Sequence, residues 1–127
     1  MIILKNKYFW IILSIIAFVI LLSVFMPKPI GMNLEKIGNG QKAVVFVYDP
    51  GLSISIEQAS EMNKARKIIG KQATFLIAKV GNPDGEGIKK RYQAHPPEIL
   101  FFNGEGELID RQVALLNAEE LARKLSN

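Results

Sequence analysis

Few side chains in this chain of 127 residues could act as a nucleophile, a base or a metal ligand. The sequence contains no cysteine and a single histidine, His95. The lack of cysteine excludes disulfide exchange, zinc–thiolate sites and cysteine nucleophiles. Ser53 or Ser55 could pair with His95, but the sequence identifies neither an orienting acid nor an oxyanion hole. We therefore expect no catalytic, cofactor-binding or metal site, and we interpret His95 as an exposed loop residue.

Two other patterns could indicate binding to phosphates or nucleic acids. The segment 81–87 contains three glycines but lacks the Gly-Lys-Ser/Thr ending of a phosphate-binding loop. Of the 16 basic residues, Lys5, Lys7 and Lys28 flank an apolar stretch, and the other 13 nearly balance the 12 acidic residues. The basic triplet 89–91 is typical of a solvated helix face. Without a basic stripe, we expect no nucleic-acid partner.

The apolar stretch at residues 8–26 contains neither a charge nor a proline. A helix of this length reaches about 28 Å, close to the roughly 30 Å hydrocarbon core of a bilayer. We therefore predict a short tail at 1–7 and a transmembrane helix at 8–26, with membrane lipid as a partner. A cleaved signal peptide is an alternative, but the stretch exceeds the usual apolar region of about 7–15 residues. A buried core helix is another, although such helices are rarely apolar all round.

Lysines lie on both sides of the predicted span. Lys5 and Lys7 precede it together with the α-amino group, and Lys28 and Lys36 follow it. The small excess of positive charge before the span favours a cytoplasmic N-terminus. We therefore expect a single-pass membrane protein whose domain lies outside the cytoplasm.

The remainder divides into a linker at 27–41, rich in proline and glycine, and a folded domain at 42–127. One helical turn is expected in the linker, around Leu34–Ile37. Ala43–Tyr48 and Thr74–Val80 are continuous apolar runs bounded by turn residues, which is typical of strands buried on both faces.

Helical patterns lie between and after these runs. Ser55 and Gln58 have the spacing of a capping box, which predicts a helix that ends at Ile69 before Gly70. Its apolar positions include Ile56. Further along, the pattern predicts a short helix at 86–93, a hairpin of Glu98–Phe102 with Glu107–Gln112, and a last helix at Ala118–Leu125 capped by Asn117 with Glu120.

The order strand–helix–strand, helix, strand–strand–helix, with a proline before the hairpin, resembles the thioredoxin fold over residues 42–126. Val44–Tyr48 resembles the strand that leads to the family's active site, and Tyr92, Pro97 and Ile99–Phe102 resemble its cis-proline region. Phe102–Ile109 resembles the terminal hairpin, and Leu116–Leu121 the start of the final helix. The resemblance implies an α/β fold with a central mixed sheet flanked by helices, preceded here by one transmembrane helix.

Two departures from the family bear on function. Thioredoxins place Cys-x-x-Cys at the start of the helix after the first central strand, where the helix N-terminus lowers the thiol pKa. Without gaps, that motif falls on Gly51-Leu52-Ser53-Ile54, and the family's buried acid falls near Val45. Thiols and acid are both lost, so we expect a redox-inactive domain and not a thiol–disulfide oxidoreductase.

The family's cis-proline corresponds to Pro97. In the family, the residue before this proline binds the partner peptide through its backbone, and here that residue is Pro96. Since Pro96 has no N–H, one strand-like hydrogen bond would be lost. We expect a membrane-tethered module that binds another envelope protein, and the resemblance implies a face made of Gly51, Leu52, Ser53, Ile54, His95, Pro96 and Pro97. Two alternatives remain: a non-redox enzyme using Ser53, Ser55 and His95, and a small subunit of a membrane complex that acts mainly through its helix.

Overall fold

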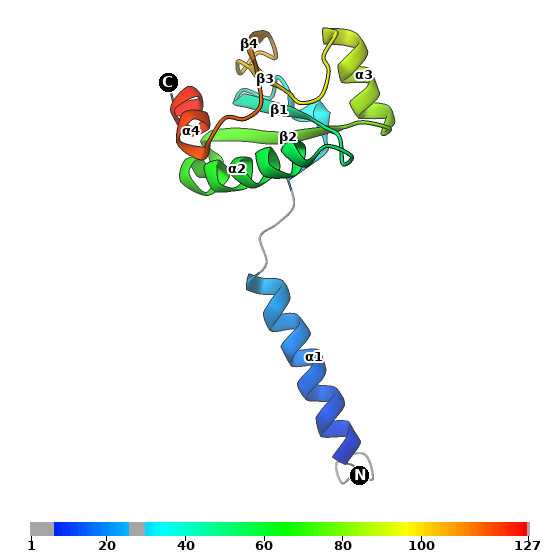
Figure 1. Cartoon of the computed structure of the whole chain (residues 1–127). Coiled ribbons are helices and arrows are strands. Elements are labelled where there is room, and N and C mark those ends of the chain that lie inside the picture. The colour runs from blue at the N-terminus through cyan, green and yellow to red at the C-terminus, as the bar shows by residue number, and fades with distance from the viewer. Residues whose placement is uncertain (1–6, 26–29, 127) are drawn as a thin grey trace.

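The structure, a computed structural model, describes residues 7–25 and 30–126. Its first element is the helix α1 (Lys7–Phe25), drawn in blue in Figure 1. No residue in its 18-residue segment Lys7–Val24 is buried, and the helix is long and apolar enough to cross a membrane. A signal sequence would share these properties. The rest of the predicted tail, at 1–6, and the last residue of the predicted span, Met26, lie outside the described residues.

A four-stranded mixed sheet forms the centre of the domain, in the order β2-β1-β3-β4 (Figure 1). Its strands are β1 (Lys42–Tyr48), β2 (Ala73–Lys79), β3 (Glu98–Phe102) and β4 (Leu108–Val113). β1 pairs in parallel with β2 and antiparallel with β3, and β3 pairs antiparallel with β4. The predicted strands are all present, and they form a mixed sheet as expected.

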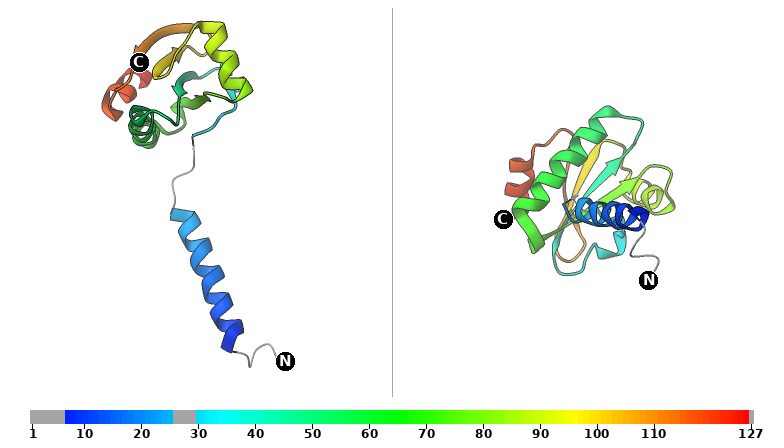
Figure 2. Two further views of the ribbon diagram at one scale, coloured as in Figure 1. Left: turned by 45° about the vertical axis from the view of Figure 1, so that its right-hand side comes forward. Right: turned by 90° about the horizontal axis from the view of Figure 1, so that it is seen from below.

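Helices cover both faces of this sheet, as the two views in Figure 2 show. α2 (Ser53–Ile69) and α4 (Ala118–Ser126) pack on one face, and α3 (Pro83–Tyr92) packs on the other. Val44 and Phe46 join the core under α2 and α4, whereas Val45 and Val47 join the core on the α3 side. β1 is continuously apolar because both of its faces are covered.

The predicted capping box at the start of α2 is wrong. α2 begins at Ser53, and its N-cap residue Leu52 makes no side-chain cap hydrogen bond. Ser55 lies inside the first turn and is fully buried. Its Oγ accepts a hydrogen bond from the backbone N of Asp49 at 3.2 Å. The serine therefore holds the preceding loop instead of capping the helix.

Gln58, the other residue of the predicted box, is also fully buried. Its Nε2 donates to the carbonyl oxygen of Leu116 at 2.9 Å, and its Oε1 accepts from the Leu116 N at 2.7 Å. Ser55 and Gln58 therefore occupy the buried face at the start of α2, whereas Ile56, expected on the apolar stripe, is 58% exposed. A partner far along the chain has replaced the local cap.

α3 begins three residues earlier than predicted. The side chain of Asn82 accepts a hydrogen bond from the Asp84 N at 3.1 Å, and Pro83 occupies the first turn. Gly85 lies so close to the backbone of Lys79 that a Cβ at this position would overlap its carbonyl oxygen. The glycine therefore allows α3 to approach the end of β2, and it is not part of a loop.

The hairpin and the last helix agree with prediction. Asn103 begins the turn, and its Oδ1 accepts from the backbone N of Glu105 and of Glu107 at 3.0 and 2.9 Å. The Oδ1 of Asn117 accepts from the Glu120 N at 2.9 Å and so caps α4. Buried residues of α4 recur at helical spacing, and they pack against α2 and β1.

The segment predicted as a linker contributes to the sheet. Gly31 forms a parallel bridge with Leu76 at the free edge of β2, and its carbonyl oxygen accepts from the Ile77 N at 2.9 Å. A short 3-10 helix, η2 (Leu34–Lys36), follows and is capped by Asn33. From residue 30 onward the chain is therefore held against the domain.

Candidate functional site

The sheet brings the two segments expected to bind a partner to the same end of the molecule. Phe46 of β1 lies opposite Ile99 of β3 in an antiparallel pair. The end of β1 and the start of β3 therefore meet at one edge, because antiparallel strands run in opposite directions. We call this edge the site edge and define it as the segments 49–54 and 94–97.

The loop between β1 and α2 is fixed by its own hydrogen bonds. The Asp49 carboxylate accepts from the Gly51 N at 2.8 Å, and the Asp49 carbonyl accepts from the Leu52 N at 3.0 Å. Together with the bond from Asp49 N to Ser55 Oγ, these contacts set the path of the chain into α2. The Asp49 side chain therefore shapes the turn.

The four positions that correspond to Cys-x-x-Cys form the corner between this loop and α2. Gly51 and Ser53 are exposed, Ile54 is half-buried, and Leu52 is 37% exposed at the N-cap of the helix. Val45, the position that corresponds to the family's buried acid, is fully buried in the apolar core on the α3 side of the sheet. The corner thus offers an apolar side chain in place of thiols, and no acid lies on β1.

Ser53, Ser55 and His95 do not form a catalytic constellation among the described residues. The buried Ser55 hydroxyl accepts the Asp49 N–H, whereas Ser53 and His95 are exposed. No hydrogen bond described in the structure joins any two of the three, and neither of the two cavities below is lined by them. Within the described ranges, no group of three or more His, Asp or Glu residues could hold a metal ion. The geometry gives no support to a serine–histidine pair.

The loop 94–97 uses most of its backbone groups internally. The Pro96–Pro97 peptide bond is cis. The His95 carbonyl accepts from the Glu98 N at 2.8 Å, and the Pro97 carbonyl accepts from the Ala114 N at 3.0 Å. Since Pro96 has no N–H, the site edge offers a partner strand few backbone donors here.

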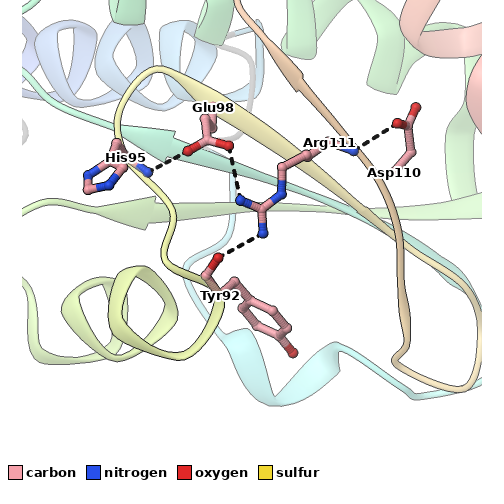
Figure 3. Close-up of polar contacts among 5 residues, drawn as sticks. All are labelled: Tyr92, His95, Glu98, Asp110 and Arg111. Atoms are coloured by element: carbon pink, nitrogen blue, oxygen red, sulfur yellow. Dashed lines mark hydrogen bonds and ion pairs between the residues drawn. The ribbon is translucent and has the colours of Figure 1, made fainter.

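A polar network that the sequence pattern did not indicate ties this loop to β4 (Figure 3). The Glu98 carboxylate accepts from the His95 N at 2.8 Å and from the Arg111 guanidinium at 3.4 Å. Arg111 also donates to the Tyr92 carbonyl at 2.7 Å, so its side chain connects the end of α3 to the start of β3. Glu98 and Arg111 lie diagonally across two strands whose register shifts at Phe101/Phe102. The pairing requires that register, and the opposite charges alone could not have identified it.

Three carboxyl groups have lowered pKa values, and each has a structural cause. Hydrogen bonds from Lys124 and then Gln112 lower the pKa of Asp110. Hydrogen bonds from Lys64 and then the Ala118 N lower that of Glu61. The pKa of Glu86 is lowered chiefly by the Gly81 N–H. The three carboxylates stabilise the positions of helices and loops, and they lie outside the site edge.

Two cavities are lined by residues outside the site edge. A groove of about 650 Å³ between η2, α3 and the hairpin turn is lined by polar and charged side chains, among them Asn33, Glu35, Asp84 and Arg91. A smaller groove of about 280 Å³ lies beside the free edge of β2. Its lining is mainly apolar and comes from the entering chain, both parallel strands and α2: Ile30, Met32, Tyr48, Ala59, Asn63, Ile77 and Lys79.

Solved structures similar to this chain include two thioredoxins and a thioredoxin-like protein. A thioredoxin-like protein from Clostridium perfringens gives a TM-score of 0.65 at 17% identity, covering 80% of this chain and 82% of that one. Thioredoxin-2 of the malaria parasite, described as a component of its protein secretion machinery, gives 0.61 at 16% identity over 68% and 82%. The exposed lipoprotein thioredoxin of Streptococcus pneumoniae gives 0.60 at 14% identity over 69% and 85%.

No protein-family model and no curated protein sequence matches the chain. The structural likenesses nevertheless show its fold, which is thioredoxin-like as the sequence predicted. Because the chain contains no cysteine, it has this fold without the thiols of a Cys-x-x-Cys motif.

Proposed function

We propose that this chain is a membrane-tethered, redox-inactive thioredoxin-like module that binds another protein at its site edge, outside the cytoplasm. The observation that carries this function is the arrangement of the site edge and the residues that occupy it. The corner before α2 and the cis-proline loop lie at the same end of the sheet, while the thiol positions hold the exposed apolar Leu52. The two segments that would hold a partner therefore lie together, whereas the thiols needed for redox chemistry are absent.

The exposed apolar side chains favour a protein partner. Leu52, at the N-cap of α2, is 37% exposed, and Ile54 and Pro96 at the same site edge are half-buried. Small clusters of this kind supply much of the binding energy of protein interfaces. The lost N–H at Pro96 shifts recognition from backbone hydrogen bonds toward such side-chain contacts.

The membrane location is supported by α1 and by the charges around it. α1 is apolar over 18 residues with none of them buried, which suits a helix surrounded by lipid. The small excess of positive charge before residue 8, which includes Lys7 at the start of α1, favours a cytoplasmic N-terminus and hence a domain on the other side.

Crosslinking and pull-down of the full-length chain from its native membrane tests this function. The Leu52→Asp variant should lose the crosslinked partner, because a charge would be buried at the centre of the contact. Ile68→Asp is the matched control, since Ile68 is 60% exposed near the other end of α2. Pro96→Ala should restore a donor and strengthen binding by about 0.5–1.5 kcal/mol, the net value of one hydrogen bond.

Two outcomes would redirect the interpretation. If Leu52→Asp retains its partner as fully as Ile68→Asp does, the site edge is not the interface. If replacing α1 by an unrelated span abolishes capture while Leu52→Asp does not, the chain acts mainly through its helix as a subunit of a membrane complex.

A further inference from the structure

Exposed apolar side chains also gather where the chain enters the domain. The 280 Å³ groove beside β2 is lined by Ile30, Met32, Ala59 and Ile77, with Lys79 at the end of the strand. Met32 is 40% exposed, and Ile56, one turn before Ala59 on α2, is 58% exposed. We call the groove together with Ile56 and Lys67 the tether face.

The distance between this face and the end of α1 is limited by the chain. α1 ends at Phe25, and Gly31 is hydrogen-bonded to β2. Six residue steps of at most about 3.3–3.6 Å each place Gly31 within about 20 Å of the helix end. A domain of roughly 100 residues has a radius of gyration of about 13 Å, so its diameter exceeds this reach. The domain therefore stays within one diameter of the end of α1. If α1 spans a bilayer, the surface around Gly31 stays close to the headgroups.

The charges around the groove suit an anionic membrane surface. Lys67 lies on the same stripe of α2 as Ile56 and Asn63, because these positions recur at helical spacing. Neither Lys67 nor Lys79 takes part in the salt bridges found among the described residues. The view from below in Figure 2 shows α2 lying across the sheet on the side facing the viewer. Apolar side chains bordered by lysines are typical of surfaces that settle in the headgroup region.

We propose that the tether face rests on the bilayer that holds α1, with Met32 and Ile56 against lipid and Lys67 and Lys79 against anionic headgroups. This inference relies on the proposed function only for the membrane anchor and requires no protein partner. Contact with the bilayer would hold the site edge at a fixed height above the membrane. A partner would then have to present its binding segment close to the membrane surface.

The lack of native cysteine allows a direct test in the full-length chain. Single cysteines at Met32 and Ile56 carry an environment-sensitive nitrobenzoxadiazole dye in nanodiscs of equal parts phosphatidylcholine and phosphatidylglycerol. Val113→Cys is the matched surface control, because Val113 is 63% exposed on β4 at the opposite edge of the sheet. Ile15→Cys in α1 reports on the anchor itself. Dyes at Met32, Ile56 and Ile15 should be quenched by doxyl-labelled lipid, and the dye at Val113 by aqueous iodide.

Reversing the charges should release the face from the membrane. Each of Lys67→Glu and Lys79→Glu should lower the ratio of docked to free domain by at least about fivefold, the effect of one basic residue near an anionic surface. Iodide quenching at Met32 should rise accordingly, and nanodiscs of phosphatidylcholine alone should give the same increase.

The outcomes separate this inference from the proposed function. If Ile15 is quenched by lipid but Met32 and Ile56 behave like Val113, the domain does not rest on the bilayer, although the anchor stands. If Met32 and Ile56 are shielded from both quenchers, protein covers the face and the lipid contact is wrong. If Ile15 is not quenched by lipid, the anchor and this inference fail together.

Discussion

Replacing Gln58 by alanine removes the buried side chain that holds α2 against the segment before α4. Gln58 is fully buried, and its amide both donates to and accepts from the backbone of Leu116, at 2.9 and 2.7 Å. Leu116 is itself only 9% exposed. The alanine variant would leave both backbone groups of Leu116 without a partner in a site with little access to water.

The expected loss of stability follows from these contacts. A net hydrogen bond contributes about 0.5–1.5 kcal/mol, and a buried polar group left without a partner costs about 1–3 kcal/mol. For two such groups we expect a loss of about 3–5 kcal/mol, a large part of the roughly 5–15 kcal/mol that keeps a domain folded. At about 4–8 °C per kcal/mol, the melting temperature should fall by about 12–40 °C.

Circular dichroism during thermal unfolding of the full-length chain in detergent measures this loss. Glu57→Ala, an exposed neighbour on α2, is the control and should change stability by no more than about 0.5 kcal/mol. Gln58→Met keeps most of the volume but removes both hydrogen bonds, so it should still lose more than Glu57→Ala. A Gln58→Met variant as stable as the wild type would refute the assignment of this stability to the hydrogen bonds.

The fragment from Gly31 onward should unfold cooperatively, because the buried residues of both core clusters lie within it, and a broad melt would contradict independent folding. The same fragment should not reduce insulin, and turnover above background would contradict the prediction of a redox-inactive domain. Gly85→Ala should destabilise the chain by about 1–3 kcal/mol through overlap with the end of β2, whereas Gly87→Ala, with open space around it, should stabilise by about 0.5–1 kcal/mol. Urea titrations that give both variants the same sign would refute this packing. Asp110 has a lowered pKa, so its contribution is present above the unfolded value of about 3.9 and disappears as the pH falls through the folded value. Carboxyl NMR should give a pKa for Asp110 below its ordinary range, and this pKa should be higher in Lys124→Gln.

Elements whose signals are local could be predicted from the sequence. β1 and β2 are apolar runs bounded by turn residues, and both formed within one residue of their expected ends. The late start predicted for α3 was avoidable, because Asn82 followed by Pro83 is a typical helix start. Gly85 lies inside α3, where a residue without a side chain is needed for close packing against Lys79.

Features that depend on distant partners could not be predicted. Ser55 and Gln58 have capping-box spacing, but bonds to Asp49 and to the distant Leu116 determine where they lie. The bridge between Gly31 and β2 is a single pair with no sequence pattern. At the site edge, the family resemblance implied that the two segments lie together, whereas the Glu98–Arg111 network depends on a register that shifts within the strand.

Leu52 occupies a position where its residue type costs stability, which supports a role in binding. It has the extended backbone of an N-cap residue but no side-chain oxygen to accept an N–H from the first turn. Aspartate there would supply that oxygen and a favourable charge at the helix N-terminus, so Leu52→Asp should raise the stability of the domain by about 0.5–2 kcal/mol. The same change should weaken partner capture, so that stability and binding move in opposite directions. A Leu52→Asp variant that both melts earlier and loses its partner would instead indicate that Leu52 acts through packing.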